Sequence, residues 1–289
     1  MAPDVTREVK PRLVAGSCPV CGGNEWARHE RVRHSEVVKC VSCGLGRTVP
    51  TPDALAQDYG TARGAVLRSG ERQLWRRFAK TQLELLGPPA SDRGRPARLL
   101  DVGSSVGALV DEATLCGWCA AGFEPDYGAC TIARRSVGGA VVNSFLGPSS
   151  VRAGSFDAVV LSHVLEHVDD PSEMLRSVWG ALSDGGRILV ACPNFSGGLA
   201  RLQGPKWYGY AIDQHVWHFT PWSLARAINA AGFNVVKVHP SQVMQYRSPF
   251  LPRLTQPFIN LAVHLVGRLG LGDEVVVVGR KVSLGTTIP

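Results

Sequence analysis

The stretch LLDVGSSVGALV, residues 99–110, decides the fold. It is an apolar run that breaks into glycines and serines and then resumes as an apolar pattern, which is typical of a strand turning tightly into a helix. A Walker loop would need a Lys after its last glycine, and a dinucleotide fingerprint would need Gly at 103, 105 and 108. The chain carries Gly103, Ser105 and Ala108 there, so both phosphate-binding interpretations are weakened.

An acid and several small residues define the ligand chemistry of this turn. Asp101 lies two residues before Gly103, and Ser105 and Gly107 follow it. Glycine permits a positive φ and lets a ligand lie directly against the backbone. The acid can accept a hydrogen bond from an amino group or from the amides of the loop. This chemistry suits a ligand that combines a cationic amino acid with a nucleoside and carries no phosphate.

The next apolar stretch, CAAGFEPD at 119–126, ends in Glu124 and Pro125. Glu124 follows the turn by about 20 residues, where nucleotide-binding folds place a carboxylate on ribose hydroxyls. The chain here resembles the class I S-adenosylmethionine-dependent methyltransferases, whose motif acid-x-Gly-x-Gly-x-Gly is matched by DVGSSVG with Ser105 as the middle residue. Three later stretches match the same family in the same order: FDAVVLSHVLEHVDDP (156–171), LSDGGRILVACPN (182–194) and HVWHFTPWSLARAINAAGF (215–233).

The resemblance implies S-adenosylmethionine as cofactor and a set of residues that bind it. The methionine end of the cofactor would be lined by Asp101, Gly103, Ser105 and Gly107. Glu124, with Pro125 beside it, would hold the ribose, and Ser162 and His163 would lie close to the cofactor.

Strand and helix patterns alternate after residue 97, which predicts a parallel sheet covered by helices. Two later strands would complete the sheet as the antiparallel hairpin of the family does. The expected fold is therefore α/β, a Rossmann-like seven-stranded methyltransferase sheet with helices on both faces. The expected strands are 98–102, 120–123, 140–145, 156–161, 187–191, 234–239 and 274–282, and the expected helices begin at 106, 128, 172 and 221.

Two CxxC knuckles near the amino terminus, separated by 18 residues, predict a zinc site built from Cys18, Cys21, Cys40 and Cys43. Four thiolates close the tetrahedron and leave no open position, so the metal would be structural. Iron is the less favoured occupant. Alternating residues between the knuckles indicate short strands, as in a zinc ribbon. The other cysteines, Cys116, Cys119, Cys130 and Cys192, are expected to pack in the interior.

The expected organisation is a zinc ribbon at 1–50, a helical linker at 51–96 and a methyltransferase domain at 97–289. The chain has 289 residues, 45% of them hydrophobic and 19% charged, which is ordinary globular composition. A Pro- and Gly-rich cluster at 87–97 follows a helix expected at 71–86.

The net charge of +7 lies entirely ahead of the glycine turn. Residues 1–100 carry 17 Lys and Arg against 10 Asp and Glu, and the remainder balances at 14 against 14. A basic arm can bind a nucleic acid or can be the solvated face of a helix. The second interpretation is favoured because no aromatic-rich stacking segment accompanies the charge.

The amino terminus, MAPDVTREVK, has no apolar signal segment, which predicts a cytoplasmic protein. The longest apolar stretch, 257–271, is interrupted by three polar residues at a spacing of four. It is therefore expected to be an amphipathic helix that packs against its own domain or against a second copy of the chain in a homodimer.

Histidines are the candidate catalytic residues, since a methyl acceptor must be oriented and a hydroxyl acceptor must lose its proton. His167 could be the base, or could have a structural role at the start of the next helix. The long loop at 195–220 would lie above the methyl donor and contributes His215 and His218. These two histidines with Asp213 could instead hold a divalent metal, and Trp207, Tyr208 and Trp217 would suit a sugar face or an aromatic ring.

The favoured function is methylation of an oxygen atom on a small molecule or glycan. One alternative is an rRNA or tRNA methyltransferase that grips RNA with its zinc module and basic arm. Another is a zinc-binding scaffold that has lost activity, for which Ser105 is the only support.

Overall fold

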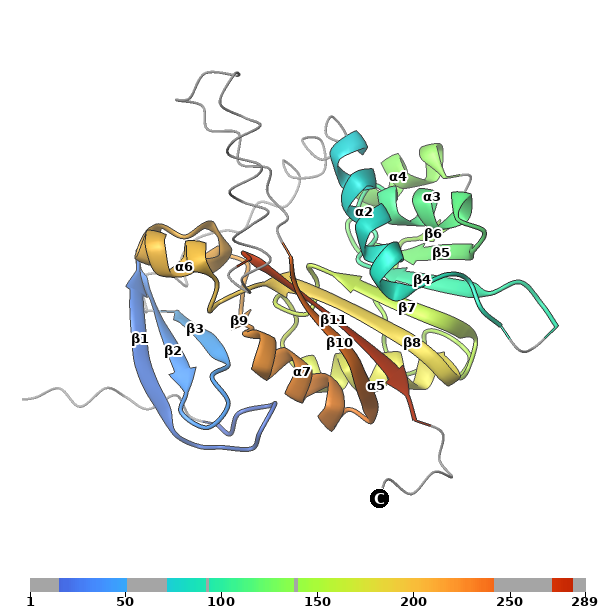
Figure 1. Ribbon diagram of the computed structural model, residues 1–289. Coiled ribbons are helices and arrows are strands. Elements are labelled where there is room, and N and C mark those ends of the chain that lie inside the picture. The colour runs from blue at the N-terminus through green and yellow to red at the C-terminus, as the bar shows by residue number, and fades with distance from the viewer. Residues whose placement is uncertain (1–15, 51–71, 92–93, 138–139, 242–271, 283–289) are drawn as a thin grey trace, which may run out of the picture.

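The computed structural model describes residues 16–50, 72–91, 94–137, 140–241 and 272–282. A seven-stranded sheet with the order β10-β11-β8-β7-β4-β5-β6 crosses the molecule (Figure 1). Strand β11 runs antiparallel to both of its neighbours, and the pairs among the other five strands are parallel. This confirms the expected α/β fold. The strands are β4 (Arg98–Val102), β5 (Cys119–Phe123), β6 (Val141–Val142), β7 (Phe156–Ser162), β8 (Leu182–Pro193), β10 (Phe233–Ser241) and β11 (Glu274–Lys281).

Helices cover both faces of this sheet (Figure 1). Helices α2 (Arg72–Leu86), α3 (Ala108–Leu115) and α4 (Tyr127–Ser136) lie on one face, and α5 (Pro171–Ala181) and α7 (Pro221–Ala230) lie on the other. Strand residues such as Leu99 and Leu100 are fully buried because they point into these two layers. Burial of each such side chain contributes about 1.5–3 kcal/mol.

Side-chain caps open α5 and α7, and the residue that caps α5 is Asp170 and not His167. Thr220 accepts the backbone N–H of Ser223, whose hydroxyl in turn accepts the N–H of Thr220, so a capping box opens α7. Asp170 accepts two N–H groups at the start of α5. Each cap satisfies amides that have no partner within the helix. The connection between β8 and β9 also holds α6 (Gly198–Gln203), η2 (Gly204–Lys206) and η3 (Tyr208–Tyr210).

The amino-terminal module forms a second sheet with the order β1-β2-β3-β9. Its first two strands, β1 (Trp26–Val32) and β2 (Ser35–Cys40), are the short strands predicted between the knuckles, and the third, β3 (Gly46–Pro50), follows the second knuckle. The fourth strand, β9 (Trp217–His218), comes from the long loop and was not predicted. It pairs antiparallel with β3, so two segments about 170 residues apart form one sheet.

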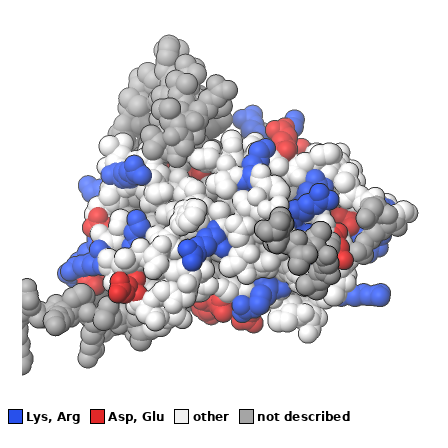
Figure 2. Space-filling model, turned by 60° about the horizontal axis from the view of Figure 1, so that its bottom comes forward, with Lys and Arg blue, Asp and Glu red and all other residues white. Residues whose placement is uncertain are grey.

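Helix α2, expected within a linker, packs against α3 and buries Ala79, Leu83 and Leu86 in the core. Its basic face is partly paired, because Arg76 contacts acids of α3. On the face shown in Figure 2, the described Lys and Arg side chains are spread among uncharged residues, with acidic groups between them.

The prediction that the other four cysteines pack in the interior is wrong for two of them. Cys130 and Cys192 are buried as expected, whereas Cys116 and Cys119 are exposed. Helix α3 ends at Leu115, and the turn through Gly117 carries both thiols to the surface. Within the described residues, no helix has the length and apolar character needed to cross a membrane. The helix expected at 257–271 and the first part of the expected linker, residues 51–71, lie outside the described residues.

Candidate functional site

The glycine turn between β4 and α3 lies at the carboxyl edge of the sheet and forms one wall of a cleft of about 840 Å³. Gly103 has a φ of 74°, and a Cβ there would meet Val164 Cγ2 at 2.5 Å. No residue with a side chain fits without displacing Val164. The cleft has the size of a site for a cofactor and a small substrate.

The predicted carboxylates lie on this wall. Glu124 accepts the N–H of Ser105 at 2.6 Å through Oε2 and the N–H of Asp126 at 2.8 Å through Oε1. Glu124 therefore holds the turn and the start of α4 together. Asp101 is buried beside it, and burial, reinforced by the negative charge of Glu124, raises the pKa of Asp101 well above its usual value. Pro125 lines the cleft next to Glu124.

Polar atoms without partners lie along the same wall. Ser105 Oγ, Ser104 Oγ and Trp75 Nε1 are buried and make no hydrogen bond within the described part of the chain. All three residues line the cleft. Because a buried polar group costs free energy unless it is paired, these atoms point to a polar ligand in this part of the cleft.

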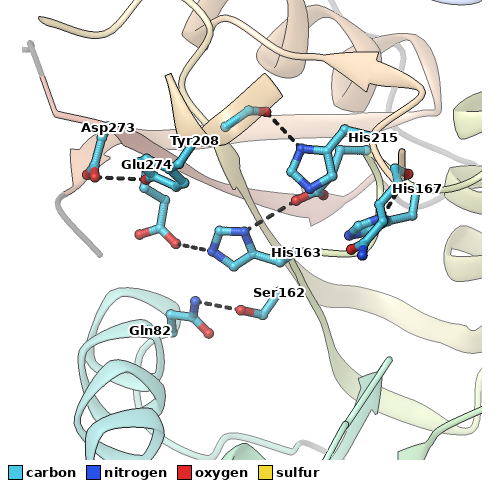
Figure 3. A network of polar contacts seen from close by, with 11 residues as sticks. Gln82, Ser162, His163, His167, Tyr208, His215, Asp273 and Glu274 are labelled. Atoms are coloured by element: carbon cyan, nitrogen blue, oxygen red, sulfur yellow. Dashed lines mark hydrogen bonds and ion pairs between the residues drawn. The ribbon is translucent and has the colours of Figure 1, made fainter. Parts of the chain in front are cut away.

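A charged network spans the floor of the cleft (Figure 3). His163 Nε2 lies 3.0 Å from Glu274 Oε1, and His163 Nδ1 lies 3.2 Å from Glu166 Oε1. Burial lowers the pKa of His163, but the contacts with the two carboxylates and their negative charges outweigh burial and raise that pKa to about 10. Burial likewise opposes ionisation of Glu166, and contact with His163 overrides it and lowers the pKa of Glu166 to about 2. The trio is one imidazolium between two acids and carries a net negative charge at neutral pH.

Two further histidines, His167 and His215, line the cleft beside Glu166 of this network. The rings of His167 and His215 pack edge to face with centroids 4.7 Å apart. His167 Nδ1 lies 3.0 Å from the carbonyl of Gln214, and His215 Nδ1 lies 2.8 Å from the carbonyl of Gly209. Burial lowers the pKa of His215, so its ring is neutral at pH 7.

The structure brings together nine of the eleven predicted cofactor-binding and catalytic residues. These nine line one cleft: Asp101, Gly103, Ser105, Glu124, Pro125, Ser162, His163, His167 and His215. Gly107 and His218 do not line it.

Gly107 is the N-cap of α3 and faces α4, where a Cβ would meet the side chain of Ala133 at 3.2 Å. Its small size serves helix packing. His218 lies in β9, 3% exposed, with Nε2 2.8 Å from Thr48 Oγ1. Because His218 faces the interior, a catalytic role does not fit its position.

The structure does not bring together the alternative metal ligands of the loop, Asp213, His215 and His218, either. Asp213 pairs with Arg33 and His34 of the amino-terminal module. Trp207 and Trp217 are buried, and among the three aromatic candidates only Tyr208 lines the cleft.

Sequence reasoning missed several lining residues. Glu274 opens β11, and Tyr208 donates to Asp273 just before that strand at 2.8 Å. An acid at the start of a run of buried valines was a usable signal for Glu274, since the start of an antiparallel strand meets the carboxyl ends of its parallel neighbours. Trp75, Phe78 and Gln82 enter from α2. No sequence motif marks these three residues.

The four knuckle cysteines form a second candidate site. Cys18 Sγ lies 3.5 Å from Cys43 Sγ, and Cys21 Sγ lies 3.5 Å from Cys40 Sγ. All four sulfur atoms lie within 4.8 Å of one another. Zn–S bonds of 2.3 Å place tetrahedral thiolates about 3.8 Å apart. The four cysteines can therefore form a zinc site.

Comparisons with known proteins agree with this arrangement. The family described as Methyltransferase domain matches residues 58–238. A SAM-dependent methyltransferase from Archaeoglobus fulgidus superposes with a TM-score of 0.54 at 17% identity, covering 76% of this chain and 100% of its own. A SAM-dependent methyltransferase from Thermotoga maritima superposes with a TM-score of 0.52 at 20% identity, covering 75% of this chain and 96% of its own.

An O-methyltransferase family 2 protein from Planctomyces limnophilus, in complex with apigenin, has a TM-score of 0.52 and 16% identity, covering 75% of this chain and 60% of its own. At these identities the likeness concerns the fold. No curated protein sequence matches the chain. The family match spans more than half of the sequence, and the sheet order and glycine turn agree with it. The chain belongs to the S-adenosylmethionine-dependent methyltransferases of the methyltransferase-domain family.

Proposed function

We propose that the protein transfers a methyl group from S-adenosylmethionine to a hydroxyl oxygen of a small molecule or glycan. The observation that carries the proposal is the single cleft that joins the glycine turn to the histidine pair. A donor held at one end and an acceptor held at the other would meet within it.

The wall around the glycine turn fits the cofactor. The unpartnered Ser105 Oγ and Trp75 Nε1 offer hydrogen bonds, and Glu124 has lone pairs left for ribose hydroxyls. The net negative charge of His163 with Glu166 and Glu274 favours a cationic sulfonium and ammonium. When bound, the cofactor supplies an electrophilic methyl carbon.

The histidine pair fits the acceptor. Both Nδ1 atoms face backbone carbonyls and donate to them, so Nε2 of each ring is the atom left to bind an acceptor. An acceptor hydroxyl would bind there and lose its proton there. Methyl transfer would form the new C–O bond in line with the C–S bond that breaks and leave a neutral thioether, and the histidine Nε2 would take the proton of the hydroxyl.

The proposal includes a structural zinc ion on Cys18, Cys21, Cys40 and Cys43 and a cytoplasmic location. The proposal also keeps the three parts expected from the sequence, which are a zinc ribbon at 1–50, a helical linker at 51–96 and a methyltransferase domain at 97–289. The sharing of strand β9 and the packing of α2 support their acting as a unit.

Calorimetric titration with S-adenosylmethionine tests the proposal. Wild-type protein should bind it saturably, and Glu124→Ala should lose about 1–3 kcal/mol of binding free energy, the scale of a charged hydrogen bond left unmade. Glu84→Ala, an exposed substitution on α2 outside the cleft, is the matched control and should bind as wild type does. Absence of binding in folded protein would favour the scaffold alternative.

A methyl-acceptor screen then separates the substrate classes. Transfer to hydroxyl-bearing small molecules or glycans supports the proposal. Transfer to RNA alone, weakening steeply with salt, would replace it with the nucleic-acid alternative.

A further inference from the structure

Glu166, His167 and His215 form a cluster at the acceptor end of the cleft. Each offers one ligand atom, and the three atoms lie within 4.8 Å of one another. Glu166 and His167 follow β7, whereas His215 precedes β9. The backbone joins these segments, because the carbonyl of Glu166 accepts the N–H groups of Val216 and Trp217.

Both histidine rings are oriented as metal-binding histidines are. A carbonyl only accepts hydrogen bonds, so Nδ1 of each ring donates, at 3.0 Å to Gln214 from His167 and at 2.8 Å to Gly209 from His215. This arrangement fixes the tautomer and ring orientation and leaves Nε2 as the ligand atom. Figure 3 shows both rings at the same end of the network.

Glu166 supplies the independent observation. It is 1% exposed, and neither of its carboxylate oxygens makes a hydrogen bond with any residue that the structure describes. Its nearest charge is His163, whose Nδ1 lies 3.2 Å from Oε1 without hydrogen-bond geometry. The second carboxylate oxygen, Oε2, is buried beside the two imidazole rings and has no partner within the described residues, an arrangement that a cation would satisfy.

We propose that Glu166, His167 and His215 bind a divalent cation of the borderline class, such as Zn²⁺ or Co²⁺. Two imidazoles and one carboxylate suit such ions and leave coordination positions open. His167 and His215 line the cleft, so the open positions face the acceptor space. This site is distinct from the four cysteines and from the set with Asp213 and His218.

The role of this cation rests on the proposed function and replaces one part of it, because the two Nε2 atoms would hold the cation instead of taking the proton of the acceptor directly. A cation at this point would bind the acceptor hydroxyl and lower its pKa. The O–H bond breaks and its proton leaves to water at the cleft mouth, where His167 is exposed. The methyl carbon then exchanges its bond to sulfur for a bond to the bound oxygen. Charge and atoms balance without a further reactant.

Cobalt titration tests the site in full-length protein that carries one zinc per chain, verified by elemental analysis. Wild type should bind one Co²⁺ per chain, with d–d absorption and no thiolate charge-transfer band, because the ligands are nitrogen and oxygen. His167→Gln, at an exposed position, should weaken this binding at least ten-fold while the melting temperature stays unchanged. His239→Gln, exposed on β10 and outside the cleft, is the matched control and should bind as wild type does.

No saturable Co²⁺ signal, or equal affinity in wild type and His167→Gln, overturns the site. A thiolate charge-transfer band would assign the binding to the cysteines and also overturn it. S-adenosylmethionine binding, measured on the same samples, separates the two proposals. If the cofactor binds and Co²⁺ does not, only the metal site fails; if Co²⁺ binds and the cofactor does not, only the proposed function fails.

Discussion

Ser105 has a φ of 49°, in the left-handed region that favours glycine. Its hydroxyl is also buried without a partner. Ser105→Gly should raise the free energy of unfolding by about 1 kcal/mol more than Ser105→Ala does, because only glycine relieves the backbone. Urea unfolding of both variants measures this difference. Equal stabilities would mean that the turn carries no strain at Ser105.

His218 predicts a pH dependence of stability. Burial, with a contribution from the nearby His215, lowers the pKa of His218 to about 3. The unfolded state therefore binds the proton first as the pH falls. Stability from this residue is complete above about pH 6.5 and declines toward pH 3, with a slope of at most about 1.4 kcal/mol per pH unit.

Urea unfolding of wild type and His218→Phe between pH 7 and pH 5 isolates this effect, since the zinc site is common to both. Phe keeps the aromatic packing against Phe195 and Tyr210. The variant should lose less stability on acidification. Parallel curves would assign the pH dependence to other groups, such as His29, whose pKa burial also lowers.

At the scale of elements, the contact between β3 and β9 links the amino-terminal module to the acceptor end of the cleft. Thr48 Oγ1 donates to the carbonyl of His215 at 2.8 Å, which leaves Nε2–H of His218 as the donor to Thr48. Thr48→Val should cost about 1–3 kcal/mol of stability through two lost hydrogen bonds. It should lower the rate of methyl transfer while cofactor affinity stays unchanged.

Chemical unfolding, calorimetry and turnover measure these effects together. Thr81→Val is the matched control, because that hydroxyl is exposed and bonds only within α2. A fall in cofactor affinity equal to the fall in rate would show that β3 supports the whole cleft.

The elements of the main sheet could be predicted because alternating buried strands and capped helices have strong local signals. Strand β4 was predicted to the residue. Strand β6 is shorter than predicted, because after Val142 the chain turns toward the cleft with Ser144 and Phe145. Strand β9 could not be predicted, since two residues have no periodicity and their partner is set by tertiary packing.

The residues of the cleft also fall into those that a local motif predicts and those that no motif predicts. Residues in local motifs, such as Gly103, Glu124 and His163, could be located from the sequence. Glu274 and Trp75 reach the cleft from elements that carry no motif. His218 was misplaced because HxxH has the spacing of a ligand pair, whereas His218 lies in β9, is buried, and bonds Thr48 instead of lining the cleft.

At the scale of the molecule, the amino-terminal module shares its core with the main domain. Buried residues of the module, including Trp26 and Leu45, belong to one hydrophobic cluster with Phe219 and Leu224. Zinc-loaded protein should therefore melt in a single calorimetric transition. Removal of zinc by a chelator should lower the temperature of that transition. A separate low-temperature transition on chelation would show that the module folds independently.

The pairing of β3 with β9 also has a consequence for synthesis on the ribosome. Thr48 leaves the ribosome about 170 residues before its partner strand, which at 5–20 residues per second is on the order of ten to thirty seconds. During that interval the edge of β3 is an unpaired template for other nascent chains. Slow translation, or release of a truncated chain ending before residue 217, should therefore favour aggregation.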